Sequence, residues 1–340
     1  KFPLHFVVAR EGNPNTNLRS KYGFVKGVSG QFGITNMSRP FPKANGKGGE
    51  ALQRTFLIEF DNFSDVNELI RNLTSNDIVE YAEKVPLHQL SLTPNDPLHG
   101  SVWSLSNIQA ELAWNISTGS SNIVVAVTDN AIETTHEDLD DAIWVNPGEI
   151  PGNGIDDDGN GYIDDINGWD VGDDDNNPNP LNAGWDHGTH CAGTVGAETN
   201  NGIGVSSIGF GISIMAVKVT TDLASSQAVT NGYDGIYYSA LSGADVISCS
   251  WGGYGFSQTG QNLIDWAWNQ GSIIVAAAGN DNRNMDNAGN AHYPSNYNNV
   301  VCVASSTSAD SKSGFSNYGS AVDVTAPGSS IRSTVPFDSY

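Results

Sequence analysis

Beyond residue 101 the sequence alternates short apolar runs with longer stretches of helical composition. The runs are NIVVAV, ISIMAVKV, DVISCS, SIIVAAA and NVVCVA. Short runs without strict polar alternation are typical of parallel strands that are buried on both faces. We expect helices at residues 106–115, 187–199, 226–243 and 258–270. Strands that alternate with helices in this way predict an α/β sandwich with a mostly parallel sheet.

The first 90 residues show a different pattern, which predicts a small α+β domain. PLHFVV, TFLIEF and DIVEYAEKV are expected to be strands, and Gly, Asn and Lys dominate residues 11–54, where we expect loops. SDVNELIRNL is expected to be a short helix that Ser64 caps. Its apolar residues recur at helical spacing, at Val66, Leu69, Ile70 and Leu73.

A linker is expected at residues 91–101, where two prolines occur without an apolar period. We therefore predict three parts: a domain at residues 1–90, this linker, and a large domain at residues 102–340.

The composition excludes several classes of function. The chain has 15 basic and 38 acidic residues, a formal net charge of -23, so we expect no binding to nucleic acid or anionic lipid. No apolar run approaches the length of a membrane span. Cys191, Cys249 and Cys302 lie in apolar or small-residue runs and are expected to be buried free thiols.

Chemically capable side chains follow several of the predicted strands. NIVVAVTD ends on Asp129, SIIVAAAGN ends on Asn280, and His187 opens the helix of WDHGTHCAGT. Because active sites of parallel sheets gather at the carboxyl ends of the strands, we expect these residues to meet. An acid, a histidine and an amide can orient a base, act as that base and stabilise an oxyanion, which favours acyl transfer.

The two histidines of this segment, three positions apart, also allow a metal pair. The sequence offers no third ligand at a useful spacing, so the interpretation as a catalytic base is preferred. His187 is then the base, and His190 is expected to be a packed helix residue.

In this order, the segments VAVTDNAIETTHEDL, HGTHCAGT, SWGG and AAAGN resemble the subtilisin-like serine proteases, or subtilases. The resemblance implies a three-layer α/β/α sandwich in which Asp129 polarises the base His187 and Asn280 supplies the oxyanion hole. It also implies that residues 1–90 are an inhibitory, ferredoxin-like propeptide and that TPNDPLHGSVW begins the mature enzyme. The substrate-binding residues that it implies are Ser250, Trp251, Gly252, Gly253, Ala278, Gly279 and, at the floor of the first specificity pocket, His292.

The pocket floor has an expected consequence for specificity. A histidine near its ordinary pKa of about 6.5 becomes cationic as the pH falls. With Trp251 in the pocket wall, His292 would then favour acidic or polar P1 side chains at lower pH.

The chain departs from the family pattern at two places. The aspartate motif usually continues with a hydroxyl residue and glycine, where this chain has Asn130 and Ala131. The family's nucleophile lies in a Gly-Thr-Ser-Met motif, and no serine of this chain has that context. The nucleophile is therefore expected beyond Tyr340, in a remaining C-terminal fragment.

The acidic segment DDDGNGYIDD predicts a calcium loop. Alternate side chains and one carbonyl can face a hard cation, and the closing glutamate of an EF-hand is absent. We expect closure by Asp165 or by an acid within residues 170–175. The predicted ligands are Asp156, Asp158, Asn160, Tyr162 (through its carbonyl), Asp164 and Asp165.

A second calcium site is implied by the resemblance alone. Asp96, Asp138 and the TNNGIGV loop match positions that share a calcium in many subtilases. The ligands so implied are Asp96, Asp138, Asn201 and the carbonyls of Thr199, Ile203 and Val205.

These observations together predict the zymogen of a secreted, calcium-stabilised serine endopeptidase that cleaves protein or peptide substrates through an acyl-enzyme. Because its serine is not in the chain, a non-catalytic extracellular binding module with the same fold stays open. A calcium-dependent extracellular adhesion domain is a third possibility.

Overall fold

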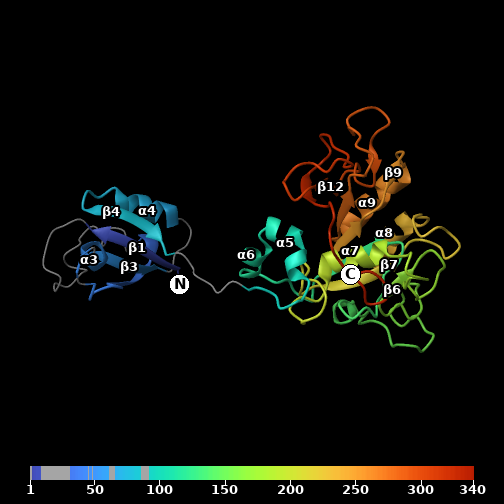
Figure 1. Ribbon diagram of the computed structural model, residues 1–340, viewed down its shortest axis with the longest axis horizontal. Helices are drawn as coiled ribbons and strands as arrows, with labels where there is room; N and C mark the ends of the chain where they lie inside the picture. Colours follow the sequence, from blue (N-terminus) through green and yellow to red (C-terminus); the bar gives the residue numbers. More distant parts are fainter. Residues whose placement is uncertain (1, 9–30, 45, 48, 61–65, 86–91) are drawn as a thin grey trace. The chain divides into compact units, whose positions relative to one another are not determined.

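The computed structural model describes residues 2–8, by their backbone, and residues 31–44, 46–47, 49–60, 66–85 and 92–340 (Figure 1). The chain forms two compact units, residues 1–89 and residues 90–340. Ser64, residues 9–30 and the stretch 86–91 lie outside the described residues.

The first unit is a four-stranded sheet with two helices, as expected for an α+β domain. The strand order is β2-β3-β1-β4, and β1 is antiparallel to both of its neighbours. Phe56, Ile58, Leu69 and Leu73 are almost fully buried and form its core. The elements are β1 (Phe2–Val8), β2 (Ile34–Ser38), α3 (Gly49–Gln53), β3 (Thr55–Phe60), α4 (Val66–Thr74) and β4 (Val79–Lys84).

The prediction of loops across residues 11–54 is wrong where β2 and α3 form, since neither short element has a clear apolar period.

The second unit is built on a seven-stranded sheet of order β13-β12-β10-β8-β5-β7-β6, in which every pair is parallel. Its strands are β5 (Val124–Asp129), β6 (Gly168–Asp170), β7 (Ser213–Lys218), β8 (Val246–Cys249), β10 (Ile273–Ala277), β12 (Val300–Ser306) and β13 (Val324–Pro327). The apolar runs therefore predicted five of these strands. They missed β6 and β13, which are short and contain polar residues or proline.

Helices cover both faces of this sheet. Ala126 of β5 belongs to a core cluster with α8 (Gly232–Leu241) and α9 (Gln258–Gln270). Its neighbour Val127 belongs to another cluster, with α7 (His187–Gly196). Because successive strand residues point to opposite faces, the two clusters lie on opposite sides of the sheet. The predicted three-layer α/β/α sandwich is confirmed.

The remaining elements are short. The helix expected at residues 106–115 is interrupted by Gln109, whose φ of 57° is left-handed, and becomes α5 (Trp103–Asn107) and α6 (Ala110–Trp114). The 3₁₀ turn η1 (His99–Ser101) precedes them in the chain, and a second 3₁₀ turn, η2 (Asp140–Ala142), follows β5. Two short strands from separate loops, β9 (Gly253–Tyr254) and β11 (His292–Tyr293), pair as an antiparallel ribbon. In the part of the chain that is described, the helices are too short or too polar to cross a membrane.

Candidate active site

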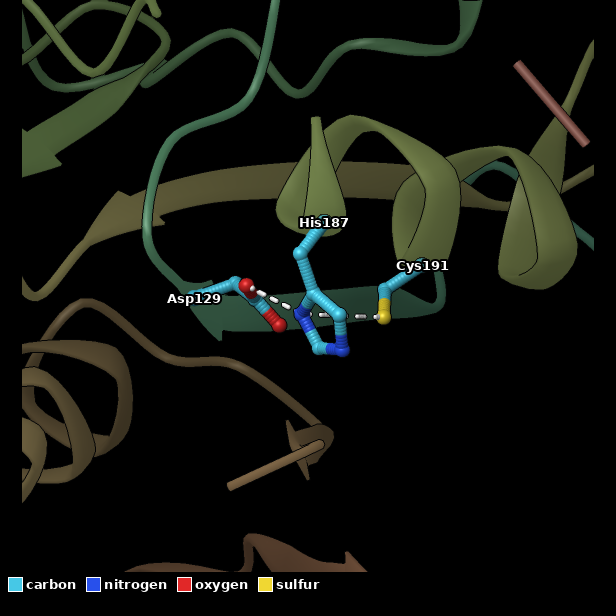
Figure 2. Close-up of side chains that lie close together, drawn as sticks. All are labelled: Asp129, His187 and Cys191. Carbon is cyan, nitrogen blue, oxygen red and sulfur yellow. Dashed lines mark hydrogen bonds and ion pairs between the residues drawn. The ribbon is translucent and has the colours of Figure 1, made fainter. Parts of the chain in front are cut away.

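Asp129 and His187 form a hydrogen-bonded pair at the carboxyl end of the sheet. Asp129 ends β5 and its side chain is 4% exposed, whereas the His187 side chain is 57% exposed. Nδ1 of His187 lies 2.7 Å from Oδ1 of Asp129. Figure 2 shows the other ring nitrogen on the far side of the ring from Asp129. The bond to Asp129 raises the pKa of His187 and holds the proton at Nδ1, which leaves Nε2 as a proton acceptor.

Close backbone packing brings this pair together. A Cβ atom on Gly188 would overlap the carbonyl oxygen of Ala131 and lie 2.9 Å from Cβ of Asp129. Only glycine therefore lets α7 begin directly against the end of β5. Gly188 therefore allows His187 to come close enough to bond to Asp129.

Asn130 ties the pair to the rest of the site. Its Oδ1 accepts hydrogen bonds from the backbone N–H groups of Ala131 (2.8 Å) and Gly188 (2.9 Å). Its Nδ2 donates to the carbonyl of Ser226 at 2.7 Å, and its own N–H donates to Oδ1 of Asp129. The departure from the family motif thus supplies a side chain that links Asp129, the start of α7 and the segment at Ser226.

The two other polar residues of the motif have different surroundings. Nε2 of His190 lies 3.2 Å from the carbonyl oxygen of Ile331, and no hydrogen bond to Asp129 exists. Sγ of Cys191 lies 3.9 Å from Nδ1 of His187 (Figure 2). Asp129, His187 and Cys191 place ligand atoms within 4.8 Å of one another. The premise that no third ligand lies near the histidine is therefore wrong, because one helical turn brings Cys191 onto its face. A metal there would have to displace the 2.7 Å Asp129–His187 bond.

A cleft of about 760 Å³ opens beside the pair. Residues 226–230 form part of its lining and lie outside α8, although the sequence pattern placed them in a helix. Trp251 is held there by its Nε1, which donates to the carbonyl of Thr128 at 3.0 Å. Of the residues predicted to form the site, the cleft is lined by Asp129, His187, Ser250, Trp251, Gly252, Gly253, Gly279, Asn280 and His292.

Ala278, also predicted to bind substrate, is 1% exposed and packs with Met285 and Cys302. Its neighbour Ala277 lines the cleft instead.

Asn280 lies in the cleft with a free amide. It follows Gly279, whose φ of 100° turns the chain sharply at the end of β10. The Asn280 side chain is exposed and makes no hydrogen bond to any described residue. An amide in this state can donate to a bound ligand.

His292 is 6% exposed, and burial lowers its pKa below the ordinary value. The ring is therefore neutral near pH 7. A cationic ring, on which the expected preference for acidic P1 side chains depends, would form only in more acidic solution than the sequence predicted.

The first predicted calcium loop brings together a different set of side chains from the alternating one. Asp158 and Asp165 place carboxylate oxygens within 4.8 Å of Glu149, which lies outside the predicted loop motif. Asn160 and Asn146 each donate to both aspartates, at 2.7–3.2 Å. No described Lys, Arg or His forms an ion pair with these carboxylates, and burial raises the pKa of Asp165. The donor set fits a hard cation.

The other predicted loop ligands have structural contacts. Asp156 accepts hydrogen bonds from the backbone N–H groups of Gly159 and Gly161, and Asp164 accepts them from Asn153 and Gly154. The ring of Tyr162 packs on Tyr238. These three side chains shape the loop.

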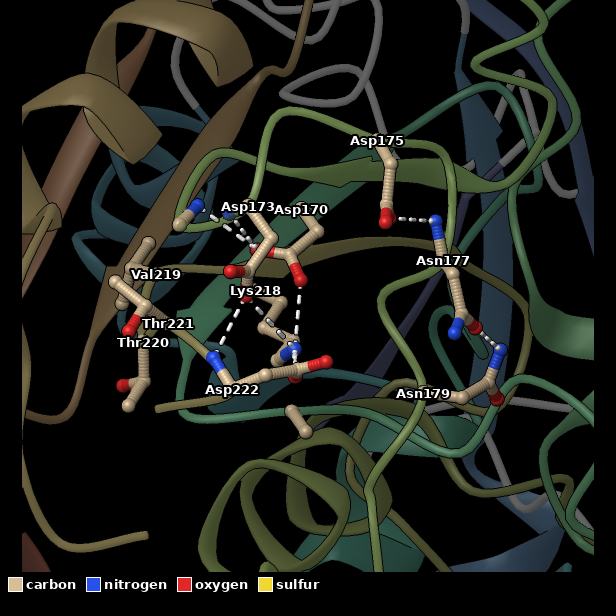
Figure 3. Close-up of polar contacts among 12 residues, drawn as sticks. Asp170, Asp173, Asp175, Asn177, Asn179, Lys218, Val219, Thr220, Thr221 and Asp222 are labelled. Atoms are coloured by element: carbon tan, nitrogen blue, oxygen red, sulfur yellow. Dashed lines mark hydrogen bonds and ion pairs between the residues drawn. The ribbon is translucent and has the colours of Figure 1, made fainter. Parts of the chain in front are cut away.

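Two of the acids of residues 170–175, Asp170 and Asp173, form ion pairs with Lys218. Figure 3 shows that Lys218 lies among Asp170, Asp173 and Asp222. Its Nζ, in a side chain that is 2% exposed, lies 2.6 Å from Asp170 and 3.8 Å from Asp173 and is bonded to Asp222. Because an ammonium group already neutralises this cluster, the expectation that it completes a calcium loop is wrong for Asp170 and Asp173.

The second implied calcium site contains two buried carboxylates, those of Asp96 and Asp138. They do not belong to any group of three or more described ligand residues close enough to share a metal ion. Asp96 accepts hydrogen bonds from the N–H groups of Asn200 and Asn201, and Asp138 accepts them from Val205 N–H and the Asn201 amide. Burial, with the nearby charges of Asp96 and Glu198, raises the pKa of Asp138 to about 7. Thr199 contributes a hydroxyl that bonds to Ala197, and Ile203 an N–H that bonds to Asn201. Two negative charges that share this region fit a cation.

Comparison with known proteins places these features in a family. The model of the subtilase family (Peptidase S8) matches residues 120–339. Thermitase of Thermoactinomyces vulgaris is 40% identical over 73% of this chain and 78% of its own length. A thermophilic serine proteinase of Bacillus sp. (strain AK1) is 35% identical over 81% of this chain and 61% of its own. The chain thus spans less than two thirds of that relative's length.

A solved protease from Pseudoalteromonas arctica PAMC 21717 has the same fold, with a TM-score of 0.54 and 32% identity over 72% of this chain and 74% of its own. The family model covers most of the unit that carries Asp129, His187 and Asn280. The chain belongs to the subtilase family, the subtilisin-like serine proteases.

Proposed function

We propose that this protein is a secreted, calcium-stabilised serine endopeptidase that hydrolyses peptide bonds through an acyl-enzyme. The observation that carries the proposal is the 2.7 Å bond from Asp129 to Nδ1 of His187, in a cleft that also holds the free amide of Asn280. Relatives described as extracellular proteases, from Natrialba magadii and Xanthomonas campestris, support secretion.

Each of the three residues has a part in the proposed reaction. Nε2 of His187 takes the proton of the nucleophilic hydroxyl and later gives it to the leaving amine. Asp129 holds the ring in the required tautomer and stabilises its cationic form. Asn280 donates a hydrogen bond to the oxyanion as charge develops on the scissile carbonyl. Residues 250–253 pair with the substrate backbone as an added strand.

We place the nucleophilic serine beyond Tyr340. Two observations support this: no described serine or threonine hydrogen-bonds to His187, and no serine of the chain lies in the family's nucleophile motif. A fluorophosphonate probe should label one serine of the full-length protein and none in residues 1–340 alone. If full-length protein does not react, the non-catalytic binding module becomes the better proposal.

Replacing Asn280 with alanine should lower kcat while the KM changes little, because the amide acts on charge that exists only in the transition state. In subtilisin, a protease of this family, loss of an oxyanion-hole donor costs about 10²–10³ in kcat. Steady-state kinetics on a peptide anilide measure the effect. Asn290→Ala, in the same loop but outside the residues that line the cleft, is the control. An equal loss in both variants would argue against the oxyanion role.

We also propose that residues 1–90 are an inhibitory propeptide, with cleavage between Pro86 and Pro94. The support is a separate compact unit with its own core. The isolated segment at micromolar concentration should block peptide hydrolysis by the mature enzyme. A Leu69→Asp version should inhibit far less, because Leu69 is fully buried in that core. Undiminished hydrolysis in the presence of the folded segment would refute the proposal.

Calcium is proposed as a stabilising ion at both acidic regions. Glu149, Asp158 and Asp165, with Asn146 and Asn160, would hold one ion, and Asp96, Asp138 and Asn201 would hold another. Calcium would neutralise carboxylates that otherwise repel one another. It takes no part in the proposed chemistry.

A further inference from the structure

The space between the two walls of the predicted P1 pocket is filled by a side chain of the protein itself. One wall is the segment at Gly252 and Gly253, and the other is the turn at Gly279 and Asn280. A Cβ on Gly252 would overlap Cε1 of His292 and lie 2.9 Å from its Nδ1. A Cβ on Gly279 would lie 2.9 Å from Cδ2 and 3.0 Å from Nε2 of the same ring. The imidazole therefore contacts the backbone of both walls.

The ring is held in this position by its backbone and by its neighbours. β11 pairs with β9 so that His292 is opposite Tyr254, and the rings of these two residues lie 5.4 Å apart, edge to face. Nδ1 of His292 lies 3.4 Å from the hydroxyl of Ser295, which itself donates to the His292 carbonyl at 2.7 Å. With 6% of the residue exposed, little space remains for it to turn away.

Polar contacts also join the two walls beyond the ring. The hydroxyl of Tyr254 donates to Asp281, and the guanidinium of Arg283 lies 4.4 Å from the centre of the Tyr254 ring. Nδ2 of Asn317 donates to both the Tyr254 hydroxyl (3.2 Å) and the Ala278 carbonyl (2.8 Å). Because Tyr254 belongs to one wall and Ala278 and Asp281 to the other, these bonds hold the walls at a fixed separation.

We infer that His292 is a specificity-determining residue that makes the P1 pocket shallow, so that the enzyme prefers small P1 side chains such as Ala and Ser. This inference rests on the proposed endopeptidase function. A large P1 ring would have to displace the imidazole from between the two backbone segments that it contacts.

The test uses full-length protein and tetrapeptide anilides that differ only at P1, with Ala, Ser, Leu or Phe. Wild-type protein should cleave the Ala substrate with a kcat/KM about 10²-fold above that of the Phe substrate. His292→Gly should raise the kcat/KM ratio of the Phe substrate to the Ala substrate by about 10²-fold. His292→Ala should have an intermediate effect, and thermal melting shows that each variant is folded.

Ser295→Ala is the matched control, because it removes the hydroxyl beside the ring but keeps the ring's volume. It should leave the order of the P1 substrates unchanged. A wild-type preference for Phe, or an unchanged ratio of Phe to Ala in both folded His292 variants, would overturn the inference and leave the endopeptidase proposal intact. No hydrolysis of any substrate, together with no labelling by a fluorophosphonate, would refute the endopeptidase proposal and this inference with it.

Discussion

Replacing His187 with alanine should abolish nearly all peptide hydrolysis by the full-length protein. In subtilisin, a protease of the same family, loss of the base costs about 10⁶ in kcat and loss of its acidic partner costs about 10⁴. We expect the same order here, because Asp129 bonds directly to the ring of His187 at 2.7 Å. Turnover of a peptide anilide, after titration of folded protein, measures both variants.

His190→Gln is the matched control. His190 lies on the same helix, but its ring lies 3.2 Å from the Ile331 carbonyl oxygen and makes no hydrogen bond to Asp129. This variant should retain activity within about tenfold of wild type. Equal losses at both histidines would show that the helix, and not a base at position 187, is what activity requires.

The acid limb of the pH dependence of kcat/KM distinguishes an effect of Asp129 on the pKa of His187 from a loss of folded protein. The hydrogen bond to Asp129 raises the pKa of His187. Since the unprotonated ring is the base, activity rises as the pH passes this pKa. Asp129→Asn removes the carboxylate and should move the limb of kcat/KM to lower pH. A limb that stays in place would contradict the assignment of the pair.

Removing calcium should lower the melting temperature by roughly 10 °C at neutral pH. An ion present at a thousandfold excess over its Kd adds about 4 kcal/mol to the free energy of unfolding. For a unit of this size each kcal/mol corresponds to about 2–4 °C. Thermal melting with and without a chelator measures the difference, and an unchanged curve would argue against both sites.

The calcium effect should also grow as the pH rises. Burial raises the pKa of Asp138 from its ordinary 3.8 to about 7. Between these values the unfolded chain loses the proton while the folded protein keeps it, so the stability of the calcium-free protein falls with increasing pH. Above pH 7 the folded protein carries the buried charge, which a cation would offset. The chelator should therefore matter more at pH 8 than at pH 5.

Two variants that each remove one carboxylate localise the effect in the loop. Asp158→Asn should reproduce part of the loss on chelation, because Asp158 lies in the cluster with Glu149 and Asp165. Asp174→Asn is the control, since Asp174 is exposed and lies outside that cluster. If both variants behave alike, net charge and not a bound ion is responsible.

The layered architecture was predictable because it depends on local patterns. A strand buried on both faces must be apolar along its length, and such runs are visible in NIVVAV or SIIVAAA without knowledge of the fold. β6 could not be predicted, because its three residues, GWD, form no apolar run. The position of Asp129 at a strand end and of His187 at a helix start also follows from the chain, since parallel strands bring their carboxyl ends to one edge.

The contacts that complete the site depend on residues far apart in the chain. Glu149 precedes the acidic loop and joins its carboxylates only after the chain folds back, whereas Lys218 comes from another strand and neutralises Asp170. The sequence alone determined five of the seven strands, the layered order of strands and helices, and the chemical types available at the sheet's edge, because these follow from periodicity and order along the chain. Only the tertiary structure decided which carboxylates share a cation-like site and that His292 fills the gap between Gly252 and Gly279, because those distances are set by packing between separate segments.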